Sequence, residues 1–276
     1  MEKIRVFTAF SGYDSQCLAL ERLKHDYPEF DYELVGWSEI DKYAIEAHDA
    51  LFPQWSERNY GDISKIEWEQ VPNFDLFTYS FPCTDISQSG RQEGMAEGSG
   101  TRSSLLWECR RAIEVKKPRW LLMENVDALV SKKFIGYFQK WVGFLTGQGY
   151  ESFSAVLNAK DYGVPQSRKR VFCVSIRNFD GEFNFPKPIG CERRLRDVLE
   201  SEPDERFYLR DEVVENFFRN NARQKDKGNG FRFEPSTRGG YSKTVTTLPC
   251  RRVSTFLDDN DQQDNTDRQH IHEGEF

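Results

Sequence analysis

The chain has 276 residues and a net charge of −7, with 38% hydrophobic and 14% aromatic residues. This length and composition allow a real core, in one large domain or a domain with a smaller one, and they exclude disorder throughout. The six cysteines include no Cys-x-x-Cys pair, so we expect neither a metal site nor a disulfide framework. With no charged-then-apolar leader and no apolar run of roughly 18 residues, the sequence favours a cytoplasmic protein.

The first 177 residues alternate between short apolar stretches typical of strands and amphipathic stretches typical of helices. Strands are predicted at residues 4–7, 34–37, 75–79, 120–123, 152–157 and 170–176. Helices are predicted at residues 15–23, 42–51, 105–116 and 134–145. This alternation predicts an α/β fold with a largely parallel sheet that is covered on both faces.

The alternation ends after about residue 180, where prolines, glycines and basic residues take over and only short helices, at 195–199 and 211–218, are predicted. Residues 219–256 hold nine Lys and Arg against two acids, whereas residues 257–276 hold seven acids and one Arg. A basic segment on an acidic body can contact phosphates, and a plain solvated segment explains the same charge equally well.

Three predicted strands end in unusual tails: Phe10-Ser11-Gly12, Phe81-Pro82-Cys83 and Glu124-Asn125-Val126. In a parallel sheet all three would open onto one crevice, where ligands bind.

Cys83 follows a predicted strand and precedes a glycine-containing loop at 84–104, so its thiol is placed like a nucleophile under a lid. A buried structural cysteine is the common alternative, and the flanking proline and polar loop weigh against it. Glu124 ends the most apolar strand, at 120–123. Alone, it fits a catalytic acid and an acid stabilised by a helix N-terminus equally well.

Two further patterns are weaker on their own. Glu39 follows the second strand, where an acid commonly binds ribose hydroxyls. Gln166, Arg168 and Arg170 alternate, so on one strand they would share a face suited to anions or base edges. A salt-bridged surface strand is the simpler explanation of that alternation.

Taken together and in this order, these pieces resemble the DNA cytosine-5 methyltransferase family. The most specific stretches are 80–87 (SFPCTDIS), 123–126 (MENV) and 157–170 (LNAKDYGVPQSRKR). The resemblance implies a Rossmann-like sheet that binds S-adenosylmethionine, releases S-adenosylhomocysteine and acts on cytosine flipped out of double-stranded DNA. It also implies a bacterial or phage enzyme of DNA modification or restriction-modification.

The resemblance assigns roles by position. The residues that it places around the cofactor are Phe10, Ser11, Gly12, Glu39, Ile40, Asp62, Ile63, Pro82 and Leu105. Cys83 corresponds to the family's nucleophile, Glu124 to the acid that binds the target base, and Arg168 to the arginine that positions the cytosine. The candidates for DNA contacts are Ser87, Gln166, Arg170, Arg232, Arg238, Lys243, Arg251 and Arg252.

The resemblance also divides the chain into a catalytic and cofactor-binding domain at 1–185, a partial target-recognition region at 186–256 and an acidic disordered tail at 257–276. Where the family usually continues its first loop with glycines, this chain has Tyr13, Asp14 and Ser15. Two blocks that normally follow the recognition region are not found. We therefore expect a truncated product or a split enzyme, poorly active alone, whose second polypeptide supplies them.

Other functions remain open at this point. A tRNA cytosine-5 methyltransferase would use the same chemistry, although that branch usually lacks a basic recognition segment. A non-catalytic DNA-binding paralogue would be expected to lose Cys83 or Glu124, and both are present. A Rossmann dehydrogenase is excluded because the glycine-rich phosphate turn is missing.

Overall fold

The computed structural model describes residues 3–87, 94–201, 204, 206, 208–226, 235–244, 256–258 and 271–273. The chain forms two compact units. Unit 1 comprises Met1–Val156 and Arg170–Phe185, and unit 2 comprises Leu157–Lys169 and Pro186–Phe276.

A six-stranded sheet forms the centre of unit 1, in the order β2-β1-β3-β4-β7-β5. Its strands are β1 (Ile4–Ala9), β2 (Tyr32–Ser38), β3 (Leu76–Tyr79), β4 (Trp120–Val126), β5 (Tyr150–Asn158) and β7 (Lys169–Arg177). The first four strands pair in parallel, and β7 pairs antiparallel with β4. The predicted α/β fold with a largely parallel sheet is confirmed.

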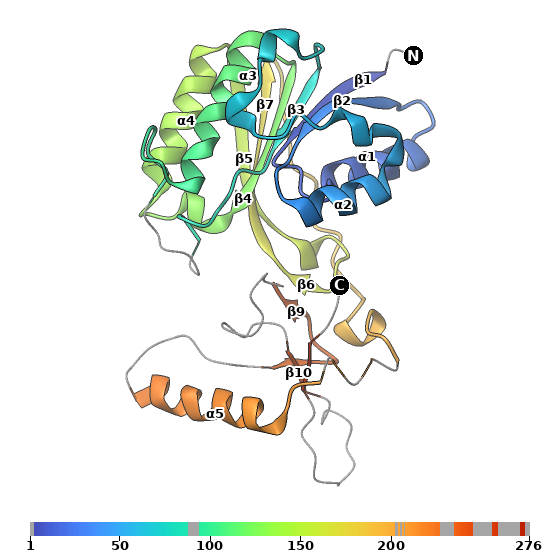
Figure 1. The fold of residues 1–276 in the computed structure, drawn as a ribbon, viewed down its shortest axis with the longest axis vertical. Coiled ribbons are helices and arrows are strands. Elements are labelled where there is room, and N and C mark those ends of the chain that lie inside the picture. The colour runs from blue at the N-terminus through green and yellow to red at the C-terminus, as the bar shows by residue number, and fades with distance from the viewer. Residues whose placement is uncertain are drawn as a thin grey trace. The chain divides into compact units, whose positions relative to one another are not determined.

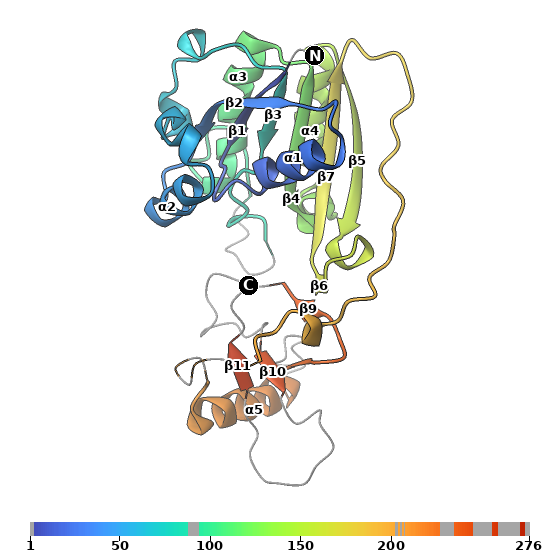
Figure 2. The same cartoon turned by 90° about the vertical axis from the view of Figure 1, so that its right-hand side faces the viewer.

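Helices cover both faces of this sheet (Figure 1). On one face lie α1 (Ser15–Asp26) and α2 (Lys42–Leu51), and on the other α3 (Glu108–Lys116) and α4 (Ile135–Gly147). Figure 2 looks onto the face of the sheet that α1 and α2 cover.

One apolar core lies on each face of the sheet. Neighbouring residues of β1 contribute to different cores. Val6 packs with Cys17 of α1 in one core, whereas Phe7 packs with Ile113 of α3 and Trp141 of α4 in the other. Successive side chains of a strand point to opposite faces, so a strand that is buried on both faces is apolar throughout. This is why the four residues of β1 from Val6 to Ala9 are all buried, with no alternation of buried and exposed positions.

The structure moves two predicted boundaries. Glu124, Asn125 and Val126 do not form a tail, because β4 continues to Val126 by pairing with β7. The predicted helix at 105–116 begins as a 3₁₀ helix, η4 (Arg102–Trp107), and becomes α-helical at Glu108.

Unit 2 contains α5 (Asp211–Asp226), which extends the helix predicted at 211–218. Its strands are β6 (Gln166–Ser167), β8 (Ser236–Thr237), β9 (Ser242–Lys243), β10 (Phe256–Asp258) and β11 (Ile271–Glu273). Strand β6 pairs in parallel with β9, and β10 pairs with β8 and β11. The predicted domain boundaries remain predictions. Among the described residues, no helix combines the length and apolar character that crossing a membrane requires.

Gly36 shows how tightly the centre of unit 1 is packed. A Cβ atom added there would lie 2.7 Å from ring atoms of both Phe7 and Tyr60. We expect Gly36→Ala to lower the free energy of unfolding by about 1–3 kcal/mol through overpacking. Chemical denaturation of the purified variant measures the change.

Gly143→Ala is the matched control, because this glycine lies within α4 and its added Cβ would meet nothing within 4 Å. Alanine is the better helix former, so we expect a gain of about 0.5–1 kcal/mol. Equal losses in both variants would contradict the packing explanation.

Candidate active site

Four parallel strands bring the candidate residues of unit 1 to one edge of the sheet. Ser11 follows β1, Glu39 follows β2 and Cys83 follows β3. Glu124 lies near the end of β4. Because neighbouring parallel strands end at the same edge, residues far apart in the sequence meet there.

The loop after β1 makes a sharp turn. Phe10, Gly12 and Asp14 all adopt left-handed backbone conformations, with φ of 55°, 58° and 65°. The Ser11 N–H donates to the Ser38 carbonyl oxygen at 3.2 Å. The Ser11 hydroxyl is buried and has no hydrogen-bond partner among the described residues. A buried polar atom without a partner is a natural place for a ligand's polar group.

The Glu39 carboxylate joins this loop to the end of β2. Its Oε2 accepts the Gly12 N–H at 2.9 Å, and its Oε1 accepts the N–H groups of Ile40 and Asp41 at 2.8 and 2.9 Å. The Asn59 side chain holds the Glu39 backbone on both sides, accepting its N–H and donating to its carbonyl oxygen, each at 3.2 Å. The carboxylate is therefore held in one orientation before any ligand binds.

Asp62 and Ile63 lie at the start of a short 3₁₀ helix, η2 (Ile63–Lys65). The Asp62 carboxylate accepts the hydroxyl and N–H of Ser64, and these hydrogen bonds, the hydroxyl's first, lower the pKa of Asp62. The Ile63 side chain is buried in the core, whereas Ile40 is 67% exposed. Of these apolar residues, Ile40 therefore has the surface available to contact a flat ring.

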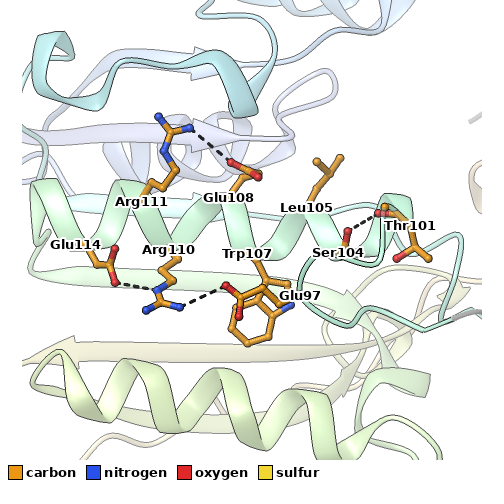
Figure 3. A pocket seen from close by; sticks show the side chains of 11 residues that line it. Glu97, Thr101, Ser104, Leu105, Trp107, Glu108, Arg110, Arg111 and Glu114 are labelled. Atoms are coloured by element: carbon orange, nitrogen blue, oxygen red, sulfur yellow. Dashed lines mark hydrogen bonds and ion pairs between the residues drawn. The ribbon is translucent and has the colours of Figure 1, made fainter.

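Leu105 lines a cavity of about 560 Å³ beside η4 and α3. Figure 3 shows Leu105, Glu108 and Arg111 on one side of the helix and Trp107 on the other. The Arg111 guanidinium donates to the carbonyl oxygens of Ser64 and Ile66, each at 3.0 Å. Leu105 therefore lies on the side of the helix that faces η2.

Cys83 lies in a tight turn directly after β3. Its carbonyl oxygen accepts the N–H groups of Ile86 at 3.1 Å and Ser87 at 2.8 Å. Its side chain is half-buried and packs against the core. The side chain is thus only partly removed from solvent, and the turn fixes the backbone that carries it.

A pair of buried polar side chains supports this turn from η4. The Ser103 hydroxyl donates to the Pro82 carbonyl oxygen at 2.7 Å and accepts the Asp85 N–H at 3.1 Å. The Asp85 carboxylate in turn accepts the Ser103 N–H at 2.9 Å. Together these bonds clamp Cys83 from both sides along the chain.

Glu124 forms an ion pair with Arg170 on the neighbouring antiparallel strand, with 3.0 Å between Oε1 and Nε. Both side chains are largely buried, with 24% and 16% exposed. Beside them, the Asn125 amide donates to the Phe81 carbonyl oxygen at 2.9 Å. This last bond ties the strand that carries Glu124 to the tail that carries Cys83.

Arg168 does not lie on a common strand with Gln166 and Arg170, which corrects the sequence interpretation. Gln166 belongs to β6 of unit 2 and Arg170 to β7 of unit 1, and the chain breaks between these strands at Arg168. The Arg168 N–H donates to the Asn158 side chain at 2.9 Å, and its carbonyl oxygen accepts the Ala159 N–H at 3.0 Å. These bonds hold Arg168 between β6 and β7, outside the strand pairings of both.

Two of the expected DNA contacts in the recognition region are described, Arg238 and Lys243. Lys243 lies on β9 opposite Ser167, and the Arg238 carbonyl oxygen accepts the Arg196 N–H at 3.0 Å. The other three expected contacts there, Arg232, Arg251 and Arg252, lie outside the described residues.

The sequence interpretation missed the supporting polar residues Asn59, Asp85, Ser103 and Asn125. Asp85 and Asn125 lie within the stretches that carry the family resemblance, so their positions were a usable signal. Nothing in the sequence marks Asn59 or Ser103, because their partners are distant in the chain. Within the described ranges, no group of three or more His, Cys, Asp or Glu side chains could hold a metal ion.

Ser103→Ala removes the hydroxyl that bridges Pro82 and Asp85. We expect faster amide hydrogen exchange at residues 83–87, by about tenfold, because a buried N–H and a buried carbonyl oxygen lose their partner. Ser104→Ala is the control, since that hydroxyl only donates to Thr101 within its own helical turn. Unchanged exchange at 83–87 in Ser103→Ala would contradict the clamp.

Known proteins resemble this chain in sequence and in fold. The model of the C-5 cytosine-specific DNA methylase family matches residues 4–273. The Type II methyltransferase M2.ScrFI of Lactococcus lactis subsp. cremoris is 37% identical, over 76% of this chain and 71% of the relative. The Type II methyltransferase M.NlaX of Neisseria lactamica is 33% identical, over 82% and 71%.

Among solved structures, the Dnmt2 methyltransferase of S. pombe aligns with a TM-score of 0.70 at 18% identity, over 95% of this chain and 78% of that one. The EhMeth methyltransferase of Entamoeba histolytica aligns with a TM-score of 0.71 at 16% identity, over 94% and 76%. At these identities the likeness shows the fold alone, and it agrees with a Rossmann-like methyltransferase sheet. The chain belongs to the C-5 cytosine-specific DNA methylase family.

Proposed function

We propose that this chain transfers a methyl group from S-adenosylmethionine to C5 of a cytosine flipped out of duplex DNA. The observation that carries the proposal is the hydrogen bond from Asn125 to Phe81, which ties the Cys83 turn to the strand of Glu124 at the carboxyl edge of the sheet. A nucleophile and an acid on adjacent parallel strands can address the same face of one base.

Cys83 supplies the nucleophile in this mechanism. Cytosine C5 is a poor nucleophile, and addition of the Cys83 thiolate at C6 moves the ring electrons toward N3 and makes C5 reactive. C5 would then take the donor's methyl group as the methyl–sulfur bond breaks, which leaves S-adenosylhomocysteine. The C5 proton is afterwards lost to a base or to water, and the S–C6 bond breaks to free Cys83. A positive group near a thiol favours its thiolate, and we assign that role to Arg168.

Glu124 offsets the charge that builds on the ring. With a proton on Oε2, Glu124 would donate to N3 as the thiolate adds, while Oε1 still accepts from the Arg170 guanidinium, so charge does not accumulate on the base. The Arg170 guanidinium fixes the orientation of the Glu124 side chain, with 3.0 Å between Nε and Oε1. The base can reach these groups only outside the DNA base stack.

The residues after β1 and β2 fit S-adenosylmethionine, which supplies an electrophilic methyl group on a sulfonium. The orphaned Ser11 hydroxyl and the fixed Glu39 carboxylate offer a donor and acceptors to its polar groups. Exposed Ile40 offers an apolar surface to the adenine ring. Phe10, Gly12, Asp62, Ile63, Pro82 and Leu105 complete the proposed pocket.

Unit 2 is the proposed reader of DNA sequence. Its β6–β9 pairing places Gln166 and Lys243 on adjacent strands, and Arg238 lies in the turn just before β9. Basic side chains there suit phosphates or guanine edges. Ser87 and Arg170 of unit 1 are the proposed contacts beside the base. The similarity to Type II methyltransferases favours a restriction-modification or phage modification setting. The second polypeptide expected from the sequence remains a prediction.

Cys83→Ala tests the covalent step. We expect it to abolish methyl transfer from labelled S-adenosylmethionine to unmodified genomic DNA, since the turn at 83–87 holds no second thiol. Bisulfite sequencing of the product maps the methylated cytosines for the parent protein. DNA that carries 5-fluorocytosine has no C5 proton to lose, so the parent protein should form with it a complex that survives SDS.

Cys191→Ala is the control thiol, a half-buried cysteine of unit 2 that should leave the SDS-resistant complex unchanged. A complex that still forms with Cys83→Ala would overturn the assignment of the nucleophile. Methylation of tRNA in place of DNA would overturn the proposed substrate and leave the chemistry in place.

Glu124→Gln tests the acid. We expect kcat to fall by about 10²–10⁴, the usual contribution of a positioned proton donor. DNA binding, measured by fluorescence anisotropy, should change little. Glu151→Gln is the control, because Glu151 is an exposed carboxylate of the same sheet. Parent-like turnover by Glu124→Gln would remove the acid from the mechanism.

A further inference from the structure

Asp14 occupies a position in the first loop where a glycine would be expected. Its φ of 65° is left-handed, a conformation that glycine adopts freely and most other residues avoid. The Asp14 side chain is fully buried. A buried carboxylate in a strained turn persists only when its surroundings hold it there.

The contacts of Asp14 close the turn from several sides. Its N–H donates to the Ser11 carbonyl oxygen at 2.8 Å. Its Oδ1 accepts the Cys17 N–H at 3.1 Å, which caps α1, and its Oδ2 accepts the Thr8 hydroxyl at 2.7 Å. Burial, and next the Asp14 carboxylate, raise the pKa of the Cys17 thiol, so that thiol stays neutral.

The imidazole ring of His48 of α2 faces this carboxylate. Its Nε2 lies 3.7 Å from Asp14 Oδ2, and its Nδ1 lies 3.5 Å from Asp49 Oδ1. The His48 ring is fully buried and stacks on Trp37, with 3.7 Å between ring centroids. Neither ring nitrogen has a hydrogen-bond partner among the described residues, so the two carboxylates are the polar groups that it meets.

We propose that Asp14 is a positioning residue for the methyl donor, acting through His48. The Asp14–His48 pair joins the loop after β1 to α2, the helix that begins just after Glu39 and its neighbours. The Gly12–Glu39 hydrogen bond joins the same two segments at their other end. The two links together set the spacing of the segments that hold the donor, and this inference rests on the proposed function.

Substitutions at Asp14 separate the carboxylate from the backbone. Asparagine tolerates the left-handed conformation, has the same shape and keeps an oxygen to accept the Cys17 N–H, but it carries no charge toward His48. Glycine keeps the backbone freedom and removes the whole side chain. A merely structural role predicts that asparagine replaces aspartate without loss.

The experiment is calorimetric titration of the full chain with S-adenosylhomocysteine. We expect Asp14→Asn and His48→Gln each to raise the Kd by about tenfold, within the usual range of coupling between sites. The double variant should be no weaker than either single variant, because both remove the same link. Asp14→Gly should bind at least as weakly as Asp14→Asn. Ser15→Ala, at the next residue, should bind like the parent because the hydroxyl of Ser15 is exposed and, among the described residues, bonds to its neighbour Gln16.

Turnover gives a second readout that separates positioning from stability. In Asp14→Asn the KM for S-adenosylmethionine should rise about tenfold while kcat at saturation changes less than about twofold. A Kd of Asp14→Asn equal to that of the parent protein would overturn the inference alone. The same holds if the increases in Kd caused by Asp14→Asn and His48→Gln multiply in the double variant. Failure of the parent protein to bind S-adenosylhomocysteine would overturn the proposed function and the inference together.

Discussion

The parallel pairing of β2, β1, β3 and β4 is the constraint on which the candidate site depends. It carries the ends of four strands, from Ala9 to Val126 and so up to 117 residues apart in sequence, to one edge of the sheet. No local sequence could bring the Ser11 loop, Glu39, Cys83 and Glu124 together. Strands β1, β2 and β3 contribute side chains to both apolar cores, and this close packing limits the movement of that edge.

Strand β7 completes the edge in a different way. It runs antiparallel to β4 and pairs with it as far as Val126 and Arg170. This pairing keeps Glu124 in regular strand geometry and places a guanidinium against its carboxylate. Because both side chains are largely removed from solvent, their attraction is screened less than that of a surface pair.

Buried polar contacts hold the loops between these strands. Asn125 reaches Phe81, Ser103 reaches Pro82, and Glu39 reaches Gly12. Each bond satisfies a backbone group that folding removes from water, so the loss of one partner leaves a buried donor or acceptor unpaired. The turn at Asp14 is held in the same way. Its buried carboxylate stabilises a left-handed backbone conformation that glycine would adopt without such contacts. The loops of the site are thus shaped by side chains as much as by their own backbones.

The sequence by itself determined the order of strands and helices in residues 1–177, the family, and the residues with candidate chemical roles, because apolar periodicity and linear motifs are local properties. It could not show that β4 runs on to Val126, or that the alternation of Gln166, Arg168 and Arg170 is split between two sheets. Nor could it reveal Ser103 or His48 as partners of the site's loops. Those features depend on strand pairing and on buried hydrogen bonds and ion pairs between distant segments. Only the tertiary structure decides them, because the partners of these polar side chains lie far away in the sequence and come within bonding distance only when the chain folds.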